Sequence, residues 1–172
     1  MEIKSLVDPE GGLVNRRSFA DREIYELERE RLFARCWLYL GHESEVPNPG
    51  DFVTAYMGEE PIILCRDLSG RLRAFLNLCR HRGNRVCRAD RGNAKVFTCS
   101  YHGWTYATDG KLAIVPMAEA FRDLDRDRWG LISVAQLDSY KGLIFATFDP
   151  EAPSLLEYLG DMAWYLDILL DR

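Results

Sequence analysis

Two short segments, each holding one cysteine and one histidine, constrain this chain more than any other feature. Cys79 and His81 stand in a Cys-x-His arrangement, and Cys99 and His102 follow seventeen residues later in a Cys-x2-His arrangement. Each segment can present one sulfur and one imidazole nitrogen to a shared point. The chain has five cysteines and three histidines in all, so these four residues are half of its soft metal ligands.

Three interpretations of these four residues are open. The cysteines can be small buried hydrophobes and the histidines hydrogen-bonded core residues, with no metal involved. Zinc also accepts two cysteines and two histidines, although structural zinc sites favour Cys-Cys and His-His pairs over mixed loops. A Rieske 2Fe–2S centre has two cysteines on one iron and two histidines on the other. Mixed loops suit that last arrangement, because each loop can give its cysteine to the inner iron and its histidine to the outer one.

Charge arithmetic explains the use of two histidines in such a centre. Two ferric ions, two sulfides and two thiolates sum to zero, whereas four thiolates would leave the centre with two negative charges. Adding an electron to a neutral centre is easier, so the reduction potential rises.

The composition limits other classes of function. The chain has 172 residues, about one domain, and its 47 % hydrophobic residues are sufficient for a buried core. The net charge of −5 argues against binding nucleic acid through an overall positive field. No apolar run approaches the roughly 20 residues of a membrane span, and no signal-peptide h-region is visible. We therefore expect a cytoplasmic protein with no nucleic-acid or membrane partner and no disulfide framework.

The sequence around both cysteine–histidine pairs resembles a known family. Residues 79–83 read CRHRG and residues 99–104 read CSYHGW, with Gly92-Asn93 between them. This pattern resembles the α subunit of Rieske-type aromatic-ring-hydroxylating dioxygenases, and residues 76–106 are most similar to the biphenyl, naphthalene and phenylpropionate branch. Respiratory Rieske proteins carry an extra, disulfide-linked cysteine in each loop. This chain has Asn84 and Tyr101 there, so that branch is disfavoured.

The resemblance implies a Rieske 2Fe–2S cluster whose ligands are Cys79, His81, Cys99 and His102. Trp104, two residues after the second histidine, could shield the cluster from water, and Tyr106 could extend that cover. Ordinary packing in the hydrophobic core is the alternative for both aromatic side chains. The family's α subunit also holds a mononuclear non-haem Fe(II) through two histidines and a carboxylate. Only His42 remains for such a site, so the resemblance implies that this second iron belongs to a catalytic domain absent from these residues.

These implications assign the chain to electron transfer within an oxidoreductase. It would take single electrons from a ferredoxin and deliver them to the catalytic iron of the oxygenase. The expected partners are the catalytic domain, a β subunit and further copies of the α subunit. A self-contained Rieske ferredoxin-like carrier is the alternative, but the helical segments before Gly41 and after Pro150 exceed what a minimal carrier needs.

A basic window surrounds the first cysteine–histidine pair. Residues 66–95 contain nine Arg or Lys and two Asp, a charge of +7, so the rest of the chain carries −12. Such a window can steer an acidic ferredoxin towards the cluster. Loop solubility and salt bridges between subunits explain it equally well.

The pattern predicts a mainly β fold, a Rieske-type antiparallel β-sheet domain with metal-binding loops, flanked by N- and C-terminal helices. We expect an N-terminal helical arm over 1–40, the Rieske 2Fe–2S domain over 41–150 and a C-terminal helix over 151–172. Short runs rich in β-branched and aromatic residues, separated by Pro-Gly, Ser-Gly and Asp-Gly turns, predict strands. They cover 51–56, 61–66, 72–77, 95–99, 111–114, 131–135 and 142–148.

Two helices are predicted at the ends of this domain. Ser18 has the character of an N-cap for a helix over 21–34 that turns Ile24, Leu27 and Leu32 inward. Ser154 and Glu157 form a capping box for the last helix. Its apolar stripe packs on its own domain or is left as an uncovered interdomain face, and consists of Leu155, Leu159, Met162, Leu166 and Leu169.

The remaining cysteines and the third histidine are expected to be structural. Cys36, Cys65 and Cys87 fit neither ligand pair and are interpreted as small hydrophobes. His42 follows Gly41 at an element boundary, where a hydrogen-bonding role is expected.

Overall fold

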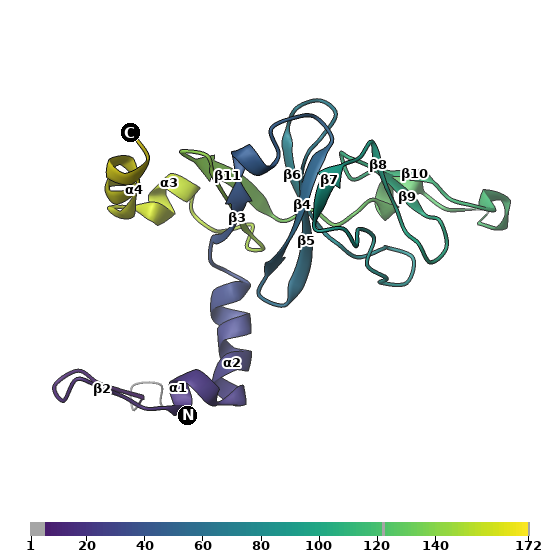
Figure 1. The fold of residues 1–172 in the computed structure, drawn as a ribbon. Helices are drawn as coiled ribbons and strands as arrows, with labels where there is room; N and C mark the ends of the chain where they lie inside the picture. Colours follow the sequence, from purple (N-terminus) through teal and green to yellow (C-terminus); the bar gives the residue numbers. More distant parts are fainter. Residues whose placement is uncertain (1–5, 122, 172) are drawn as a thin grey trace.

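Three antiparallel sheets form the body of the protein in the computed structural model, which describes residues 6–121 and 123–171 (Figure 1). The central sheet has the order β6-β5-β4-β7 and comprises β4 (Asp51–Met57), β5 (Glu60–Arg66), β6 (Leu72–Leu76) and β7 (Arg91–Asn93). The second has the order β11-β12-β3 and comprises β3 (Leu38–His42), β11 (Gln136–Tyr140) and β12 (Leu143–Thr147). The third has the order β10-β9-β8 and comprises β8 (Val96–Thr98), β9 (Thr105–Ala107) and β10 (Leu112–Ile114). The predicted mainly β, antiparallel fold is confirmed.

Strand β5 separates two hydrophobic cores, because its side chains alternate between the two faces of the central sheet. Ile62 and Leu64 pack into the core shared with β3 and β12. Ile63 and Cys65 pack into the core shared with the third sheet. All four are fully buried, which explains the continuous apolar run of this strand. Burial raises the pKa of the Cys65 thiol to about 12, so it behaves as the small hydrophobe expected.

Most predicted strands are present with boundaries shifted by one or two residues, but the strand predicted at 131–135 is wrong. This segment runs beside β6 with a single isolated bridge, between Ser133 and Phe75. Leu131 and Val134 are buried, so the apolar pattern of this segment reflects its burial and not strand pairing. Strands β3, β7, β9 and β11 were not predicted from the sequence.

The N-terminal arm begins with a hairpin and ends in a helix. Strands β1 (Val7–Asp8) and β2 (Leu13–Val14) pair, and α1 (Arg17–Ala20), α2 (Arg22–Glu28) and a π-helical turn η2 (Arg29–Phe33) follow. Figure 1 shows this arm projecting away from the three sheets.

The cap predicted for the arm helix is wrong by three residues. Asp21, not Ser18, caps α2 and accepts a hydrogen bond from the Glu23 amide at 2.9 Å. Ser18 lies inside α1. Ile24 is buried as expected, whereas Leu32 is 49 % exposed, although it lines the same apolar pocket as Ile24 and Leu27.

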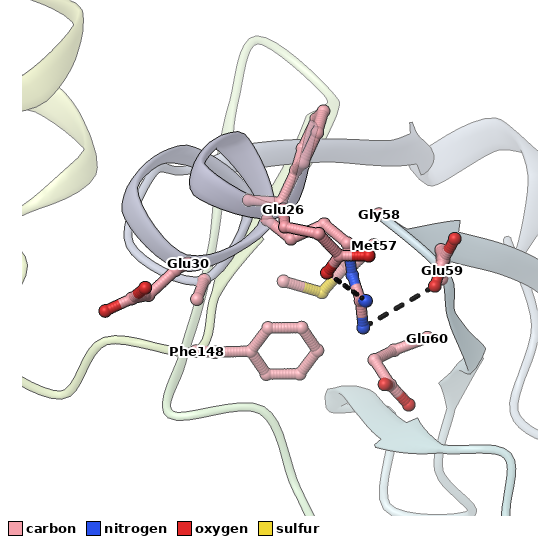
Figure 2. Close-up of a pocket in the computed structure, with 10 residues that line it drawn as sticks. Glu26, Glu30, Met57, Gly58, Glu59, Glu60 and Phe148 are labelled. Carbon is pink, nitrogen blue, oxygen red and sulfur yellow. Dashed lines mark hydrogen bonds and ion pairs between the residues drawn. The ribbon is translucent and has the colours of Figure 1, made fainter. Parts of the chain in front are cut away.

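The arm contacts the body through the turn between β4 and β5. Arg29 pairs with Glu26 at 2.9 Å and with Glu59 at 3.5 Å. Figure 2 marks these contacts to the labelled Glu26 and Glu59 with dashed lines. Gly58 occupies this turn with a φ of 61°, and a side chain there would meet Phe33 at 3.2 Å. The close approach of the arm therefore requires glycine at this position.

The C-terminal segment folds as two helices rather than the single one predicted. Helix α3 (Leu155–Leu159) begins with the predicted capping box, in which Ser154 and Glu157 bond reciprocally. Gly160, with a φ of 48°, ends it before α4 (Met162–Leu170) begins. Leu155 is buried, whereas Met162 is 54 % exposed, so the predicted stripe is continuous in sequence but not in space.

The described part of the chain also contains the short 3-10 turns η3 (Glu43–Glu45), η4 (Ala118–Ala120) and η5 (Arg126–Trp129). His42 caps the first of them, and its Nδ1 lies 2.8 Å from the Ser44 hydroxyl, which confirms its structural role. Within the described ranges no helix is long and apolar enough to cross a membrane.

Candidate metal centre

The two predicted ligand segments are hairpin loops at one end of the body. Residues 78–85, here loop 1, lie between β6 and β7 and are closed by a bridge between Leu78 and Arg85. Residues 98–105, here loop 2, join β8 to β9 and are closed by the pair Thr98 and Thr105. Each loop thus spans eight residues and has its cysteine directly after the first closing residue.

The backbone of loop 1 is held by two hydrogen bonds. The Cys79 amide donates to the Asn84 carbonyl at 2.8 Å, and the Gly83 amide donates to the Cys79 carbonyl at 2.8 Å. Gly83 has a φ of 69°, a left-handed conformation that glycine adopts without strain.

Loop 2 repeats this pattern residue for residue. The Cys99 amide donates to the Trp104 carbonyl at 2.8 Å, and the Gly103 amide donates to the Cys99 carbonyl at 2.9 Å. Gly103 has a φ of 73°. The two loops are therefore copies of one backbone frame, with each cysteine at the same place in it.

The two histidines lie side by side although they occupy different places in this frame. Their ring centroids are 4.6 Å apart, with the rings tilted by 67°. Nδ1 of His81 is buried and has no hydrogen-bond partner within the described residues, which is unusual for a buried polar atom. A metal ligand resolves this, because a neutral imidazole offers an unprotonated ring nitrogen to a metal. The donor set and this orphaned nitrogen both fit the cluster expected from the sequence.

The two cysteine thiols are buried and interact with each other, so they titrate as a pair. Burial raises the pKa of Cys79. Burial acts in the same direction on Cys99, but hydrogen bonds from the Tyr101 amide, the Asn84 side chain and the His102 amide outweigh it and lower the pKa of this thiol. The Cys99 thiolate, the form that binds iron, is therefore stabilised by donors already in place.

Tyr106 contacts the Cys79 sulfur directly, a closer role than the general cover expected of it. Its hydroxyl lies 3.3 Å from Cys79 Sγ and accepts the Arg80 amide hydrogen at 3.0 Å. Burial raises the pKa of this phenol well above its usual value, so it stays protonated. Its own proton is then available to the sulfur, which as a thiolate is an acceptor.

Aromatic side chains surround the two histidines unequally. Trp104 is buried and stacks on His81, with centroids 5.0 Å apart and planes within 8°. Phe121 adds an edge contact to His81 at 6.4 Å. His102 is exposed and stacks on Tyr101 at 3.8 Å, and Tyr101 is itself 58 % exposed. One histidine is therefore enclosed by aromatic rings and the other faces solvent.

One contact between the two loops was not predicted from the sequence. The Asn84 side chain donates to Cys99 Sγ at 3.5 Å and to the Arg85 carbonyl at 3.0 Å. Its position directly after the left-handed glycine is the only signal in the sequence, and it becomes visible once the two loops are aligned.

The arrangement of donors differs from a site for a single ion. Across the described part of the chain, no three His, Cys, Asp or Glu side chains converge in a way that could hold one metal ion. A structural zinc site needs four converging donors, whereas a binuclear cluster takes two from the protein at each iron.

The other cysteines lie away from the two loop pairs or bond elsewhere. All five cysteines are free thiols. Cys87 directs its sulfur to the Ala89 carbonyl at 3.6 Å, and Cys36 is only half-buried. The acid-rich pocket of Figure 2, about 440 Å³ between the arm and the β4–β5 turn, contains none of the predicted ligands.

The structure divides the predicted basic window into two groups. Arg66 pairs with Glu43 at 3.2 Å and Arg73 with Asp67 at 2.9 Å, so these cations are part of the scaffold. A second group is exposed and, within the described residues, forms no ion pair: Arg71, Arg82, Arg85, Arg88, Arg91 and Lys95. The ninth cation, Arg80, is half-buried and lies over the Trp129 ring. The cations of the second group are therefore exposed to a partner.

Comparison with known proteins agrees with this geometry. The model of the Rieske [2Fe-2S] domain matches residues 36–140, which include both loops. The chain belongs to the Rieske [2Fe-2S] domain family. The 2Fe–2S cofactor expected from the sequence is thus confirmed for the family, while the ligand assignment to individual side chains stays a prediction.

Relatives of this Rieske chain are subunits of dioxygenases. It is 52 % identical to the biphenyl dioxygenase subunit alpha of Metapseudomonas furukawaii, over 99 % of this chain and 39 % of that protein. It is 50 % identical to a benzene 1,2-dioxygenase subunit alpha of Pseudomonas putida, over 99 % and 38 % respectively. The resemblance to this class of α subunit is confirmed, and the chain spans about two fifths of the length of these relatives.

A solved structure shows the same fold. The naphthalene 1,2-dioxygenase of a Rhodococcus species, solved with indole bound, superposes with a TM-score of 0.85 at 50 % identity. The match covers 88 % of this Rieske chain and 35 % of that one.

Proposed function

We propose that this chain is the electron-transfer part of an aromatic-ring-hydroxylating dioxygenase α subunit. The observation that carries the proposal is the pair of equivalent loops that bring two thiols and two imidazoles together beside an unpartnered buried ring nitrogen. When bound, a Rieske 2Fe–2S cluster supplies one-electron transfer. Its ligands are Cys79, His81, Cys99 and His102, and Trp104 covers it.

The side chains around the proposed centre divide its tasks. Trp104 and Phe121 exclude water from His81. His102 is exposed to solvent, so an electron acceptor would approach the centre from the side of this histidine. The Tyr106 hydroxyl and the amides directed at both sulfurs stabilise added negative charge. The centre therefore has one insulated side and one open side.

The proposed donor is a ferredoxin with an acidic surface. The exposed cations of loop 1 and the residues after it have no ion-pair partners within the described residues and lie beside the ligand loops. They would raise the encounter rate with an acidic protein and lose this effect at high salt.

The acceptor and the aromatic substrate belong to the rest of the proposed oxygenase. The greater length of the relatives supports a further catalytic domain, and their designation as alpha subunits supports a β subunit. The mononuclear iron and the homo-oligomeric assembly are proposed from the resemblance to this family. The absence of a membrane-spanning helix among the described residues and the acidic composition are compatible with the cytoplasm as its location.

The purified chain provides the test. We expect two irons and two acid-labile sulfides per chain, visible absorption, and an EPR signal after reduction with dithionite. The reduction rate by an acidic ferredoxin is expected to fall as salt rises, and a rate indifferent to salt removes the proposed donor surface. A colourless, EPR-silent protein with one zinc per chain contradicts the proposed function. Multiple turnovers between ferredoxin and a soluble acceptor with no catalytic domain favour the self-contained carrier instead.

A further inference from the structure

Asn84 and Trp104 occupy the same place in the two copies of the loop frame. Each directly follows the left-handed glycine, and each backbone carbonyl accepts the amide hydrogen of the cysteine in its own loop. Each side chain, in contrast, reaches a predicted ligand in the other loop. Trp104 stacks on His81, and Asn84 donates to the sulfur of Cys99. The two positions thus tie the loops together in both directions.

The orientation of the Asn84 amide is fixed by its two contacts. One N–H bonds the Arg85 carbonyl at 3.0 Å and the other points to Cys99 Sγ at 3.5 Å, so both amide hydrogens are used. A flipped amide would place its oxygen against the Arg85 carbonyl and the sulfur, both of which are acceptors. The hydrogen-bonding pattern therefore selects the donor orientation.

A side-chain donor at a thiolate ligand has a defined electrostatic effect. Reduction adds one negative charge to the centre, and an N–H directed at a sulfur stabilises the more negative state. Cys99 also receives the amides of Tyr101 and His102, which belong to the loop backbone and cannot be removed by a side-chain substitution. Asn84 is the donor to this sulfur that sequence change can tune.

We propose that Asn84 is a positioning residue that holds loop 1 against Cys99 of loop 2 and raises the reduction potential of the centre. The proposal rests on the proposed function, because it requires the 2Fe–2S cluster on these loops. It concerns a residue outside the ligand set and outside the basic group.

The test is the reduction potential of Asn84→Leu, which removes the donor without changing charge. We expect a lower potential, by roughly a tenfold change in the equilibrium constant for reduction, which is about 59 mV for a one-electron couple. Asn84→Asp places a carboxylate oxygen where the N–H was, so its potential is expected to fall further. Both are measured by EPR-monitored titration.

Asn93→Leu is the matched control. Asn93 also donates two side-chain hydrogen bonds, at 3.0 Å to the Pro49 carbonyl and 2.8 Å to Asp51, but these acceptors are oxygens at the start of β4 and just before it. Its loss is expected to lower thermal stability and to leave the potential unchanged. Equal shifts in Asn84→Leu and Asn93→Leu, or an unchanged potential in Asn84→Leu, overturn the proposal.

A second measurement does not depend on the variants assembling the cluster. Reduced wild-type protein labelled with asparagine that carries ¹⁵N only in the side chain is expected to show a weak ¹⁵N coupling in pulsed EPR. Its absence overturns the proposal. A wild-type protein that contains no iron and sulfide instead removes the proposed function itself, so the two failures are distinguished.

Discussion

The two ligand loops share one backbone frame and differ in almost everything attached to it. Loop 1 carries three arginines, and its histidine is covered by Trp104 and Phe121. Loop 2 has no charged residue other than its histidine, which is exposed and stacks on Tyr101. A repeated frame can therefore position equivalent donors, while the side chains around it separate an insulated and charged side from an open and aromatic one.

The largest expected effect is the loss of the centre itself. Cys79→Ser and Cys99→Ser should each abolish cluster binding, since both sulfurs belong to equivalent positions of the frame. Cys87→Ser is the matched control, because Cys87 lies between the loops but bonds the Ala89 carbonyl. Iron and sulfide analysis with visible spectra measures the outcome. A Cys79→Ser protein with a full cluster would mean that the loops are not equivalent.

Alanine substitutions at the two loop glycines should distinguish the cost of the shared backbone conformation from the cost of side-chain crowding around each loop. Both glycines need a left-handed backbone, which costs an L-residue about 1 kcal/mol. A side chain at Gly83 would meet nothing within 4 Å, whereas one at Gly103 would lie 2.9 Å from Pro116. We expect Gly83→Ala to lose about 1 kcal/mol of unfolding free energy and Gly103→Ala about 3 kcal/mol. Chemical denaturation measures both, and equal losses would contradict the difference in packing.

The buried carboxylate of Asp67, outside both loops, is expected to affect stability in acid but not the metal centre. Burial acts to raise the pKa of Asp67, but bonds from Ser69, Arg73 and the Arg71 amide outweigh it and set the pKa at about 2. The unfolded value is near 4, so the stabilisation is present above that pH and is lost as pH falls through 2.

Asp67→Asn is therefore expected to lower the unfolding free energy by about 2 kcal/mol at pH 7 and to flatten its decline in acid. Denaturation between pH 2 and 7 measures this change. An unchanged reduction potential at pH 7 is expected as well, because Asp67 lies in the turn between β5 and β6 and contacts neither loop. An unfolding free energy that still falls steeply in acid in Asp67→Asn would mean that other carboxylates cause the acid dependence.

Tyr106→Phe should act on loop 1 alone. It removes the hydroxyl at Cys79 Sγ and leaves the Arg80 amide without its acceptor. The unfolding free energy is expected to fall by about 1 kcal/mol, and the reduction potential of the centre by tens of millivolts. Redox titration and thermal unfolding check both. An unchanged potential would show that the hydroxyl proton points away from the sulfur.

The smallest expected effect concerns the arginines of loop 1. Arg82→Gln removes an exposed charge and should weaken binding of an acidic ferredoxin roughly threefold at low salt, with a smaller salt dependence. Ser100→Ala, an exposed substitution in loop 2, should leave binding unchanged. The affinity for the ferredoxin, measured over a range of salt concentrations, tests both variants. Equal effects of Arg82→Gln and Ser100→Ala would contradict a docking role for the charge of loop 1.

The sequence predicted the features that depend on residue type and short spacing. The cysteine–histidine pairs, the antiparallel strands with β-branched runs and the Ser154 capping box were all visible. Strands such as β7, which reads Arg-Gly-Asn, were missed because they exist only through pairing with β4. Their local propensity is poor, and tertiary pairing decides them.

Contacts between distant segments were the other limit. The Asn84 bond to Cys99 and the Tyr106 bond to Cys79 join residues that are 15 and 27 positions apart. No periodicity reports such a contact. The break at Gly160 was visible as a glycine, but the apolar stripe across it favoured one helix over the observed two.

The central claim is that two thiolates from equivalent positions and two neighbouring imidazoles hold one binuclear cluster. Pulsed EPR of dithionite-reduced protein labelled with ¹⁵N-histidine tests it most directly. We expect two strongly coupled histidine nitrogens, with one coupling lost in His81→Cys and one in His102→Cys, and both kept in His42→Ala. A spectrum with no coupled histidine nitrogen, or one that needs His42, would contradict the account.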